Sequence, residues 1–520
     1  MSPSVVLARQ LVERLLACGV TDAVLAPGSR SGPVALALHA ADAQDLLRLH
    51  VRVDEREAGF LALGLARAGR RIVPVVTTSG TAAVNLHPAM VEALHTRTPV
   101  VAVTADRPAR LRGTGANQTT DQVGLFPGVA CTGDPADLGA LDEPLQLNLE
   151  LDEPLVEPTE WTFAVAPGET WSRPVAPVLG MLDAAVPTVV VAGDGAGPVA
   201  RRVAEVAGWP VLAEPTSGAR TGDHALTAYR LLLPHLESRI ERVVSFGHAT
   251  LSRPVTALLS RGDLEVVHVG RQDTFPVPTG PGVRLVDAVE TVGAADPHWL
   301  EQWRRADAAA TAAIDRVLDG STPLDVARDV SAALPPGGLL VVGSSNPIRD
   351  LDLVARPHPV GERRRVLGNR GLAGIDGMLS TAVGAALARD SSRAIALVGD
   401  LTFLHGSNGL LLGPHEPRPD LTIVVVNDDG GSIFSTLEQG AGDYASAFER
   451  VYATPTGADL GALCAGYGVP HRRVGAASLA AALAAAPQGI EVVEVAVDRQ
   501  ARRSLSERLA GAVAAAVDTA

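Results

Sequence analysis

Short apolar runs alternate with helical patterns along nearly the whole chain. Buried strands in the first third are predicted at Ala23–Ala26, His50–Val53, Arg71–Thr77 and Val100–Thr104. Apolar residues at helical spacing separate them, for example over Glu57–Ala68 and Thr81–His95. Strands that alternate with helices in this way are typical of parallel sheets covered by helices, so the pattern predicts an α/β fold.

The same rhythm returns twice more, after two irregular stretches at Leu141–Pro177 and Arg271–Pro281. Later strands are predicted at Thr188–Ala192, Val211–Ala213, Arg242–Phe246, Glu265–Val269, Leu339–Val342, Ala394–Val398, Thr422–Val426 and Val492–Val497. A chain of 520 residues is too long for one ordinary core. We therefore predict three Rossmann-like domains with parallel sheets, at residues 1–180, 181–321 and 322–520.

Composition narrows the functional classes. The net charge of −14 argues against a nucleic-acid or anionic-membrane partner. No apolar run has the length of a membrane span, and the first residues read as an amphipathic helix rather than a signal peptide. Three widely spaced cysteines favour a reducing cytoplasm. The chain contains no lysine, which excludes a pyridoxal Schiff base and a Walker-type phosphate site.

Two polar residues follow neighbouring apolar runs in the last third. Asp400 comes after the strand predicted at Ala394–Val398, and Asn427 comes after the strand at Thr422–Val426. Open α/β sheets bind ligands at the carboxyl ends of their strands. Oxygen ligands of this kind suit Mg²⁺, whose coordination is often completed by phosphate. Either residue alone could simply cap a helix or a turn, but the pair favours a binding site.

This spacing resembles the motif of thiamine-diphosphate enzymes, although Leu401 and Asp428 depart from it. The resemblance implies thiamine diphosphate as cofactor and Mg²⁺, with Mn²⁺ as an alternative, held by Asp400, Asn427 and the backbone carbonyl of Asp429. It also implies that Glu55, after the predicted second strand, binds the aminopyrimidine ring and favours its imino tautomer. Without the resemblance, Glu55 would be interpreted as a solvated residue in the first turn of a helix.

Longer strings resemble one family, the 2-succinyl-5-enolpyruvyl-6-hydroxy-3-cyclohexene-1-carboxylate synthases of menaquinone biosynthesis. They begin at Pro27, Thr77, Thr104, Gly113, Ser345, Gly368, Gly374 and Gly430. The resemblance implies a pyrimidine-binding, a middle and a diphosphate-binding domain. It also implies that 2-oxoglutarate is decarboxylated and the succinyl-semialdehyde carbanion equivalent is transferred to isochorismate. The family enzyme is a homodimer or a dimer of dimers, because the cofactor lies across a subunit interface.

The resemblance assigns site residues one by one. Catalytic roles fall to Glu55 and Gln118. The implied cofactor contacts are Pro27, Ser29, Glu55, Ser79, Gly80, Ile375, Asp400, Asn427 and Gly430. The implied substrate contacts are Arg30, Arg107, Gln118, Ser345, Arg349 and Arg370, with an apolar wall of Ile433, Phe434 and Leu437. Arginines suit this role because both substrates are polyanions.

Two alternatives compete with this interpretation. Another thiamine-diphosphate carboligase, such as an acetolactate synthase, would share the cofactor motif. A nucleotide-binding dehydrogenase or sensor is suggested by Gly193–Pro198, which follows a predicted strand, and by Glu214 at the end of the next. Pro198 replaces the third glycine of that fingerprint, so we predict a middle domain without a nucleotide. Arg201 and Arg502 are predicted on outer helices, away from any site.

Overall fold

The computed structural model describes residues 1–139, 141–163, 178–270 and 282–518. Its named strands pair only in parallel, in two six-stranded sheets, one five-stranded sheet and one two-stranded sheet. This confirms the predicted α/β fold. The second irregular stretch, Arg271–Pro281, lies outside the described residues. None of the described helices is long and apolar enough to cross a membrane.

The first sheet has the strand order β2-β1-β3-β4-β6-β5. Its strands are β1 (Asp22–Leu25), β2 (Arg48–Val51), β3 (Val73–Thr77), β4 (Val100–Asp106), β5 (Ala130–Thr132) and β6 (Leu145–Glu150). Its helices are α1 (Pro3–Ala17), α2 (Gly32–Asp42), α3 (Glu55–Gly69), α4 (Thr81–Val84) and α5 (His87–Thr96). The single helix predicted over Thr81–His95 is thus two helices, because a new one begins at His87, with Pro88 in its first turn.

The middle of the chain forms the five-stranded sheet, in the order β12-β11-β10-β8-β9, and the small β13-β7 sheet. Its strands are β7 (Leu179–Asp183), β8 (Thr188–Ala192), β9 (Val211–Ala213), β10 (Arg242–Phe246), β11 (Glu265–Val269), β12 (Arg284–Val286) and β13 (Ala288–Val292). Its helices are α6 (Pro198–Ala207), α7 (Tyr229–Leu236), α8 (Arg253–Leu259) and α9 (Pro297–Val317). The domain limits remain a prediction, and β7 begins two residues before the limit at residue 181.

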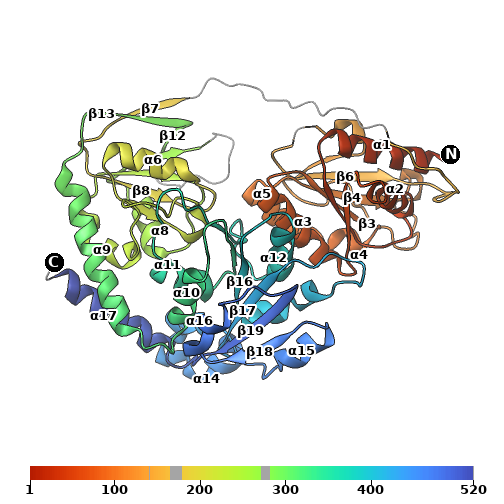
Figure 1. Ribbon diagram of the computed structural model, residues 1–520. Helices are drawn as coiled ribbons and strands as arrows, with labels where there is room; N and C mark the ends of the chain where they lie inside the picture. Colours follow the sequence, from red (N-terminus) through yellow and green to blue (C-terminus); the bar gives the residue numbers. More distant parts are fainter. Residues whose placement is uncertain (140, 164–177, 271–281, 519–520) are drawn as a thin grey trace.

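The last sheet has the order β15-β14-β16-β17-β19-β18. Its strands are β14 (Leu339–Val342), β15 (Arg365–Leu367), β16 (Ala394–Gly399), β17 (Leu421–Asn427), β18 (His471–Val474) and β19 (Ile490–Ala496). Its helices are α10 (Pro323–Ala332), α11 (Asn346–Val354), α12 (Met378–Leu387), α13 (Asp400–His405), α14 (Ala445–Phe448), α15 (Leu460–Gly466), α16 (Leu479–Ala482) and α17 (Arg502–Val517). Figure 1 shows α17 lying beside α9 of the middle unit.

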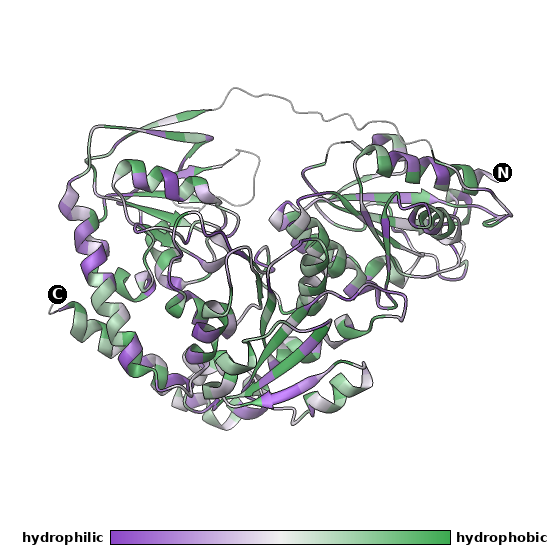
Figure 2. Cartoon of the chain, in the orientation of Figure 1, coloured by the Kyte–Doolittle hydropathy of each residue, from purple (hydrophilic) through white to green (hydrophobic). Residues whose placement is uncertain are grey.

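The first and last units meet through helices α3 and α12, whose residues share one buried core (Figure 1). Gly64 and Gly384 allow the close approach, since a Cβ atom at Gly64 would lie 2.2 Å from the Thr381 carbonyl oxygen and one at Gly384 2.3 Å from that of Leu61. Figure 2 shows both helices as largely apolar, so this contact is part of the hydrophobic core.

Candidate active site

The predicted pair of strand-end residues comes together at the carboxyl edge of the last sheet. Strands β16 and β17 are adjacent and parallel, with Gly399 opposite Val426. Asp400, the first residue of α13, is only 4% exposed, and its Oδ2 accepts a hydrogen bond of 2.8 Å from the Gly430 backbone N–H. Burial, with the nearby Asp428, raises the pKa of Asp400 to about 7. The site therefore favours a bound cation, which would stabilise the charged carboxylate.

Asn427 is oriented by a residue that the sequence did not reveal. Its Nδ2 donates to Glu494 Oε1 at 2.8 Å, and its Oδ1 accepts from the Asp429 N–H at 2.9 Å. Glu494 lies on β19, is 4% exposed, and also contacts His471 Nε2 at 2.9 Å. Because Glu494 holds the amide nitrogen and the amide oxygen accepts only one hydrogen bond from the described residues, that oxygen keeps a lone pair for a further ligand.

The third predicted ligand, the carbonyl of Asp429, already has one partner. Arg499 Nη1 donates to this oxygen and to the Asp428 carbonyl, the latter at 3.1 Å. Asp429 has a left-handed backbone (φ 50°), and its side chain accepts from the backbone N–H groups of Thr456 and Gly457. A carbonyl oxygen has two lone pairs, so one remains for a metal ion.

Ser79, Arg107 and Gln118, which are all predicted site residues, contact one another in the first unit. Arg107 Nη1 donates to Ser79 Oγ at 2.9 Å and to the Gln118 carbonyl at 2.8 Å. Gln118 Nε2 donates to the Ser79 carbonyl at 2.9 Å. A Cβ atom at Gly80, which has a φ of 75°, would lie 2.9 Å from Gln118 Cγ. Only glycine fits here without strain.

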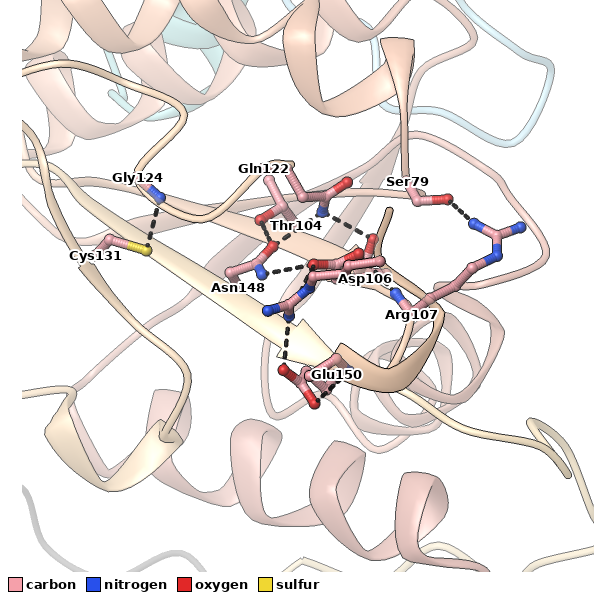
Figure 3. A network of polar contacts seen from close by, with 12 residues as sticks. Ser79, Thr104, Asp106, Arg107, Gln122, Gly124, Cys131, Asn148 and Glu150 are labelled. Carbon is pink, nitrogen blue, oxygen red and sulfur yellow. Dashed lines mark hydrogen bonds and ion pairs between the residues drawn. The ribbon is translucent and has the colours of Figure 1, made fainter. Parts of the chain in front are cut away.

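A buried polar network lies next to this cluster (Figure 3). Asn148, on β6, accepts at Oδ1 from Thr104 Oγ1 and Gln122 Nε2, and donates from Nδ2 to Asp106 at 3.0 Å. Asp106 also accepts from the Arg107 N–H at 2.7 Å. The network thus fixes the end of β4, from which Arg107 extends.

The remaining predicted residues of the first unit lie at the start of α3 and in the turn after β1. Glu55 is the first residue of α3, and its Oε2 accepts a long hydrogen bond of 3.3 Å from Asn85 Nδ2. Pro27 and Ser29 are exposed in the turn after β1. Arg30 donates to the Leu151 carbonyl at 3.1 Å. Burial, together with the nearby Arg30, lowers the pKa of Arg107, so these two arginines face a common region.

Arg349 and Arg370 form a second pair of arginines, in the last unit. Arg349, on α11, donates to the Ser345 carbonyl at 2.7 Å. Arg370 is 2% exposed and donates to Thr250 Oγ1 of the middle unit at 3.1 Å. Burial and the proximity of Arg370 lower the pKa of Arg349 to about 10. Arg349 is half-buried and Arg370 is buried, so two neighbouring cations that repel each other could both be stabilised by an anion.

The predicted apolar wall lies on a short 3₁₀ helix at Ser432–Thr436 and just after it. Ile433, Phe434 and Leu437 are half-buried there, as is the more distant Ile375. Asn346 Nδ2 donates to Ser432 Oγ at 2.7 Å, which joins this segment to the Ser345 turn.

The middle unit reaches the same segment. Arg253, on α8, forms a salt bridge of 2.7 Å with the exposed Glu438, next to Leu437. Arg253 lowers the pKa of Glu438 to about 2.

Comparison with known proteins places these features in a family. The family models for the N-terminal and C-terminal domains of thiamine pyrophosphate (thiamine diphosphate) enzymes match residues 5–125 and 352–497. Over 96% of both chains, the protein is 55% identical to a 2-succinyl-5-enolpyruvyl-6-hydroxy-3-cyclohexene-1-carboxylate synthase of Nocardioides sp.. The chain belongs to this family. Synthases of Kineococcus radiotolerans and Paenarthrobacter aurescens are 47% and 45% identical, over 99% and 98% of this chain and 100% and 97% of theirs.

Membership in this synthase family makes the protein a thiamine-diphosphate-dependent transferase and decides against both alternatives. The glycine-rich segment that suggested a dehydrogenase serves internal contacts instead. A Cβ atom at Gly193 would lie 2.1 Å from the Ala249 nitrogen, and Asp194 binds Arg67. Glu214 accepts from the Leu251 N–H at 2.8 Å. The individual site residues stay predictions.

The prediction for Arg502 was wrong. Arg502 begins α17 but is not on an outer face, since its side chain is only 10% exposed. Both of its terminal nitrogens bind the buried Asp350, at 2.9 and 2.5 Å. Because Asp350 lies on α11 and the ion pair is buried, Arg502 packs against that helix instead of facing solvent.

Proposed function

We propose that the protein decarboxylates 2-oxoglutarate and transfers the succinyl-semialdehyde carbanion equivalent to isochorismate, as the family name implies. The product is 2-succinyl-5-enolpyruvyl-6-hydroxy-3-cyclohexene-1-carboxylate, and the reaction takes place in the cytoplasm. Thiamine diphosphate, when bound, supplies the electron sink for the carbon–carbon bonds that are broken and formed.

The described residues fit this cofactor and its metal ion. Asp400, which follows β16, and Asn427 and the carbonyl of Asp429, which lie at the end of β17, offer three hard oxygen atoms at one edge of the sheet, the donor set that Mg²⁺ or Mn²⁺ accepts. Among the described residues there is no group of three acidic, histidine or cysteine side chains that could hold a metal elsewhere. Ser29 and Gly430 would contact the cofactor, and Glu55 would bind the pyrimidine ring.

The observation that best supports polyanionic substrates is the presence of two arginine pairs. Arg107 lies near Arg30, and Arg349 lies near Arg370, so that within each pair one cation lowers the pKa of the other. Arg107, Arg349 and Arg370 have no ion-pair partner within 4 Å among the described residues. Carboxylates of the substrates would supply the missing charge, while Gln118 would orient the acceptor.

A homodimer, or a dimer of dimers, would complete the site. The contacts of Glu55, Ser79, Arg107 and Gln118 lie within the first unit. Those of Asp400 and Asn427 lie within the last unit. We propose that each cofactor lies between the first unit of one protomer and the last unit of its partner. Size-exclusion chromatography with light scattering tests this proposal, and a fully active monomer would contradict it.

A two-substrate assay tests the function directly. The purified protein, supplied with thiamine diphosphate and Mg²⁺, should consume 2-oxoglutarate and isochorismate, and mass spectrometry should detect the expected product. Pyruvate in place of 2-oxoglutarate should be used at least about 10²-fold less efficiently, since it lacks the distal carboxylate. Equal use of pyruvate would remove succinyl transfer but leave the thiamine assignment in place.

A further inference from the structure

Glu92, in the first unit, binds the backbone of the loop that carries Arg370 in the last unit. Its two carboxylate oxygens accept hydrogen bonds of 2.7 Å each from the N–H groups of Gly371 and Leu372. Glu92 lies on α5 and is 4% exposed. Hydrogen bonds from backbone N–H groups to a buried carboxylate are among the stronger ones in proteins. The two residues held by Glu92 directly follow Arg370 in the sequence.

Arg67 holds the same loop on the other side of Arg370. Arg67, on α3, donates from Nη1 to the Gly368 carbonyl at 2.5 Å, and this nitrogen lies 3.9 Å from Glu92. Its Nη2 binds Asp194 of the middle unit. Arg67 therefore binds the loop two residues before Arg370, and Glu92 binds it one and two residues after Arg370. Both side chains belong to the first unit.

Close packing leaves this loop little freedom. A Cβ atom at Gly371 would lie 2.8 Å from His95 Cβ, 3.0 Å from the Glu92 carbonyl oxygen and 3.1 Å from Glu92 Cδ. The loop thus lies directly on α5, and only glycine permits the approach. Such contact places the Gly371 backbone by shape as well as by hydrogen bonds.

The Arg370 side chain, by contrast, has few partners of its own. Its Nη2 donates to Thr250 Oγ1 at 3.1 Å, while its buried Nε has no partner among the described residues. A long side chain that lacks an ion pair is placed chiefly by its backbone. We propose that Glu92 is a positioning residue, which holds the backbone beside Arg370 so that the guanidinium meets a substrate carboxylate. This inference rests on the proposed function, in which Arg370 binds substrate.

Kinetics of Glu92→Gln in the holoenzyme test this role. Glutamine keeps the shape but presents an NH₂ group to one of the two N–H donors. We expect KM for 2-oxoglutarate to rise about 10-fold while kcat changes less than about 3-fold, the effect of one lost charge-assisted hydrogen bond on ground-state binding. In an Arg370→Ala background the same change should alter KM less than about 2-fold, because the loop then has no arginine to position.

Asp307 provides a matched control. It also accepts from two consecutive backbone N–H groups, those of Thr227 and Ala228 at 3.0 and 2.7 Å, but it lies on α9 in the middle unit. Asp307→Asn should lower thermal stability without changing KM. An unchanged KM in Glu92→Gln, or equal effects of this substitution with and without Arg370, would overturn the proposal. Should Glu92→Gln not fold, the shorter Glu92→Asp is judged by the same two results.

Hydrogen–deuterium exchange separates this inference from the proposed function, because it needs no substrate. The amides of Gly371 and Leu372 should exchange about 10-fold faster in Glu92→Gln than in the unaltered protein. Exchange at the original rate would refute the hold of Glu92 on the loop. Faster exchange in a protein that does not use 2-oxoglutarate would instead refute the proposed function alone.

Discussion

Arg349 is the arginine whose environment predicts the largest effect on substrate choice. Burial and the nearby Arg370 lower its pKa to about 10. At about 1.36 kcal/mol per pKa unit, keeping Arg349 charged costs roughly 3 kcal/mol before any ligand binds. A substrate carboxylate that reaches the pair would recover part of this free energy. A charged hydrogen-bonding pair contributes about 1.5–3 kcal/mol, which agrees with that value.

Arg349→Ala should therefore lower kcat/KM for 2-oxoglutarate by about 10- to 100-fold. The value for pyruvate, which has no second carboxylate, should fall by less than about 3-fold, so the preference between the two donors should narrow. Steady-state decarboxylation rates with each donor, at saturating thiamine diphosphate and Mg²⁺, provide the measurement. The protein should not become less stable, because the substitution removes a charge that the fold holds at a cost.

Arg201 is the matched control for this experiment. It lies on α6 and pairs with Glu205 of the same helix, so its replacement removes a contact within the middle unit and none of the predicted substrate contacts. Arg201→Ala should leave both rates unchanged. Equal losses with 2-oxoglutarate and pyruvate after Arg349→Ala would refute the reasoning, since the arginine would then act on the fold or the cofactor rather than on the distal carboxylate.

Three further predictions follow from individual contacts. Asp400→Ala, or chelation of the metal, should abolish retention of thiamine diphosphate, measured by mass spectrometry of the denatured protein. Burial raises the pKa of Glu57 from 4.5 to about 7. Ionisation of this buried carboxyl should therefore lower the stability of the fold progressively as the pH rises from about 4.5 to 7. Glu57→Gln should raise the melting temperature at pH 8 but not at pH 4.5. Gly64→Ala would bring Cβ within 2.2 Å of an α12 carbonyl oxygen and should destabilise the protein by about 1–3 kcal/mol in urea unfolding. Gly511→Ala is the control, because Gly511 has open space around it, and it should stabilise the protein by about 0.5–1 kcal/mol.

The positions of Asp400 and Asn427 at strand ends could be predicted, because the apolar run before each residue determines where its strand ends. An apolar run that ends in Asp400, followed by another that ends in Asn427, places both residues at one sheet edge whatever the rest of the chain does. The residues that orient the site could not be predicted in this way. Glu494 meets Asn427 across 67 residues, and Glu92 meets Gly371 across 279. No local spacing marks a carboxylate whose partner lies so far away in the sequence.

Strand β6 was missed for a related reason. It falls within Leu141–Pro177, which the proline and glutamate content suggested was a connection. Its sequence alternates apolar residues with Gln146 and Asn148, a pattern that fits a half-exposed strand. Both polar side chains are in fact buried, because their hydrogen bonds are satisfied: Asn148 belongs to the network in Figure 3, and Gln146 Nε2 donates to Thr104 Oγ1 at 3.1 Å. Residues 164–177 of that stretch lie outside the described part of the chain.

Among the described residues, buried arginines have carboxylate partners in the core but not in the candidate site, and this difference supports a polyanionic substrate. Arg220 and Arg502 are buried with carboxylates, Asp352 at 3.1 Å and Asp350 at 2.5 Å. Arg370 is as deeply buried, yet no carboxylate of the described residues lies within 4 Å of it. Since the fold can pair a buried arginine where only stability is required, an unpaired one is costly unless something else supplies the charge. In a protein of net charge −14, carboxylates are abundant, and Glu214 is close enough for Arg370 to affect its pKa, yet it accepts from the Leu251 N–H and forms no ion pair with Arg370. The unpaired guanidinium therefore favours a partner that arrives with the substrate.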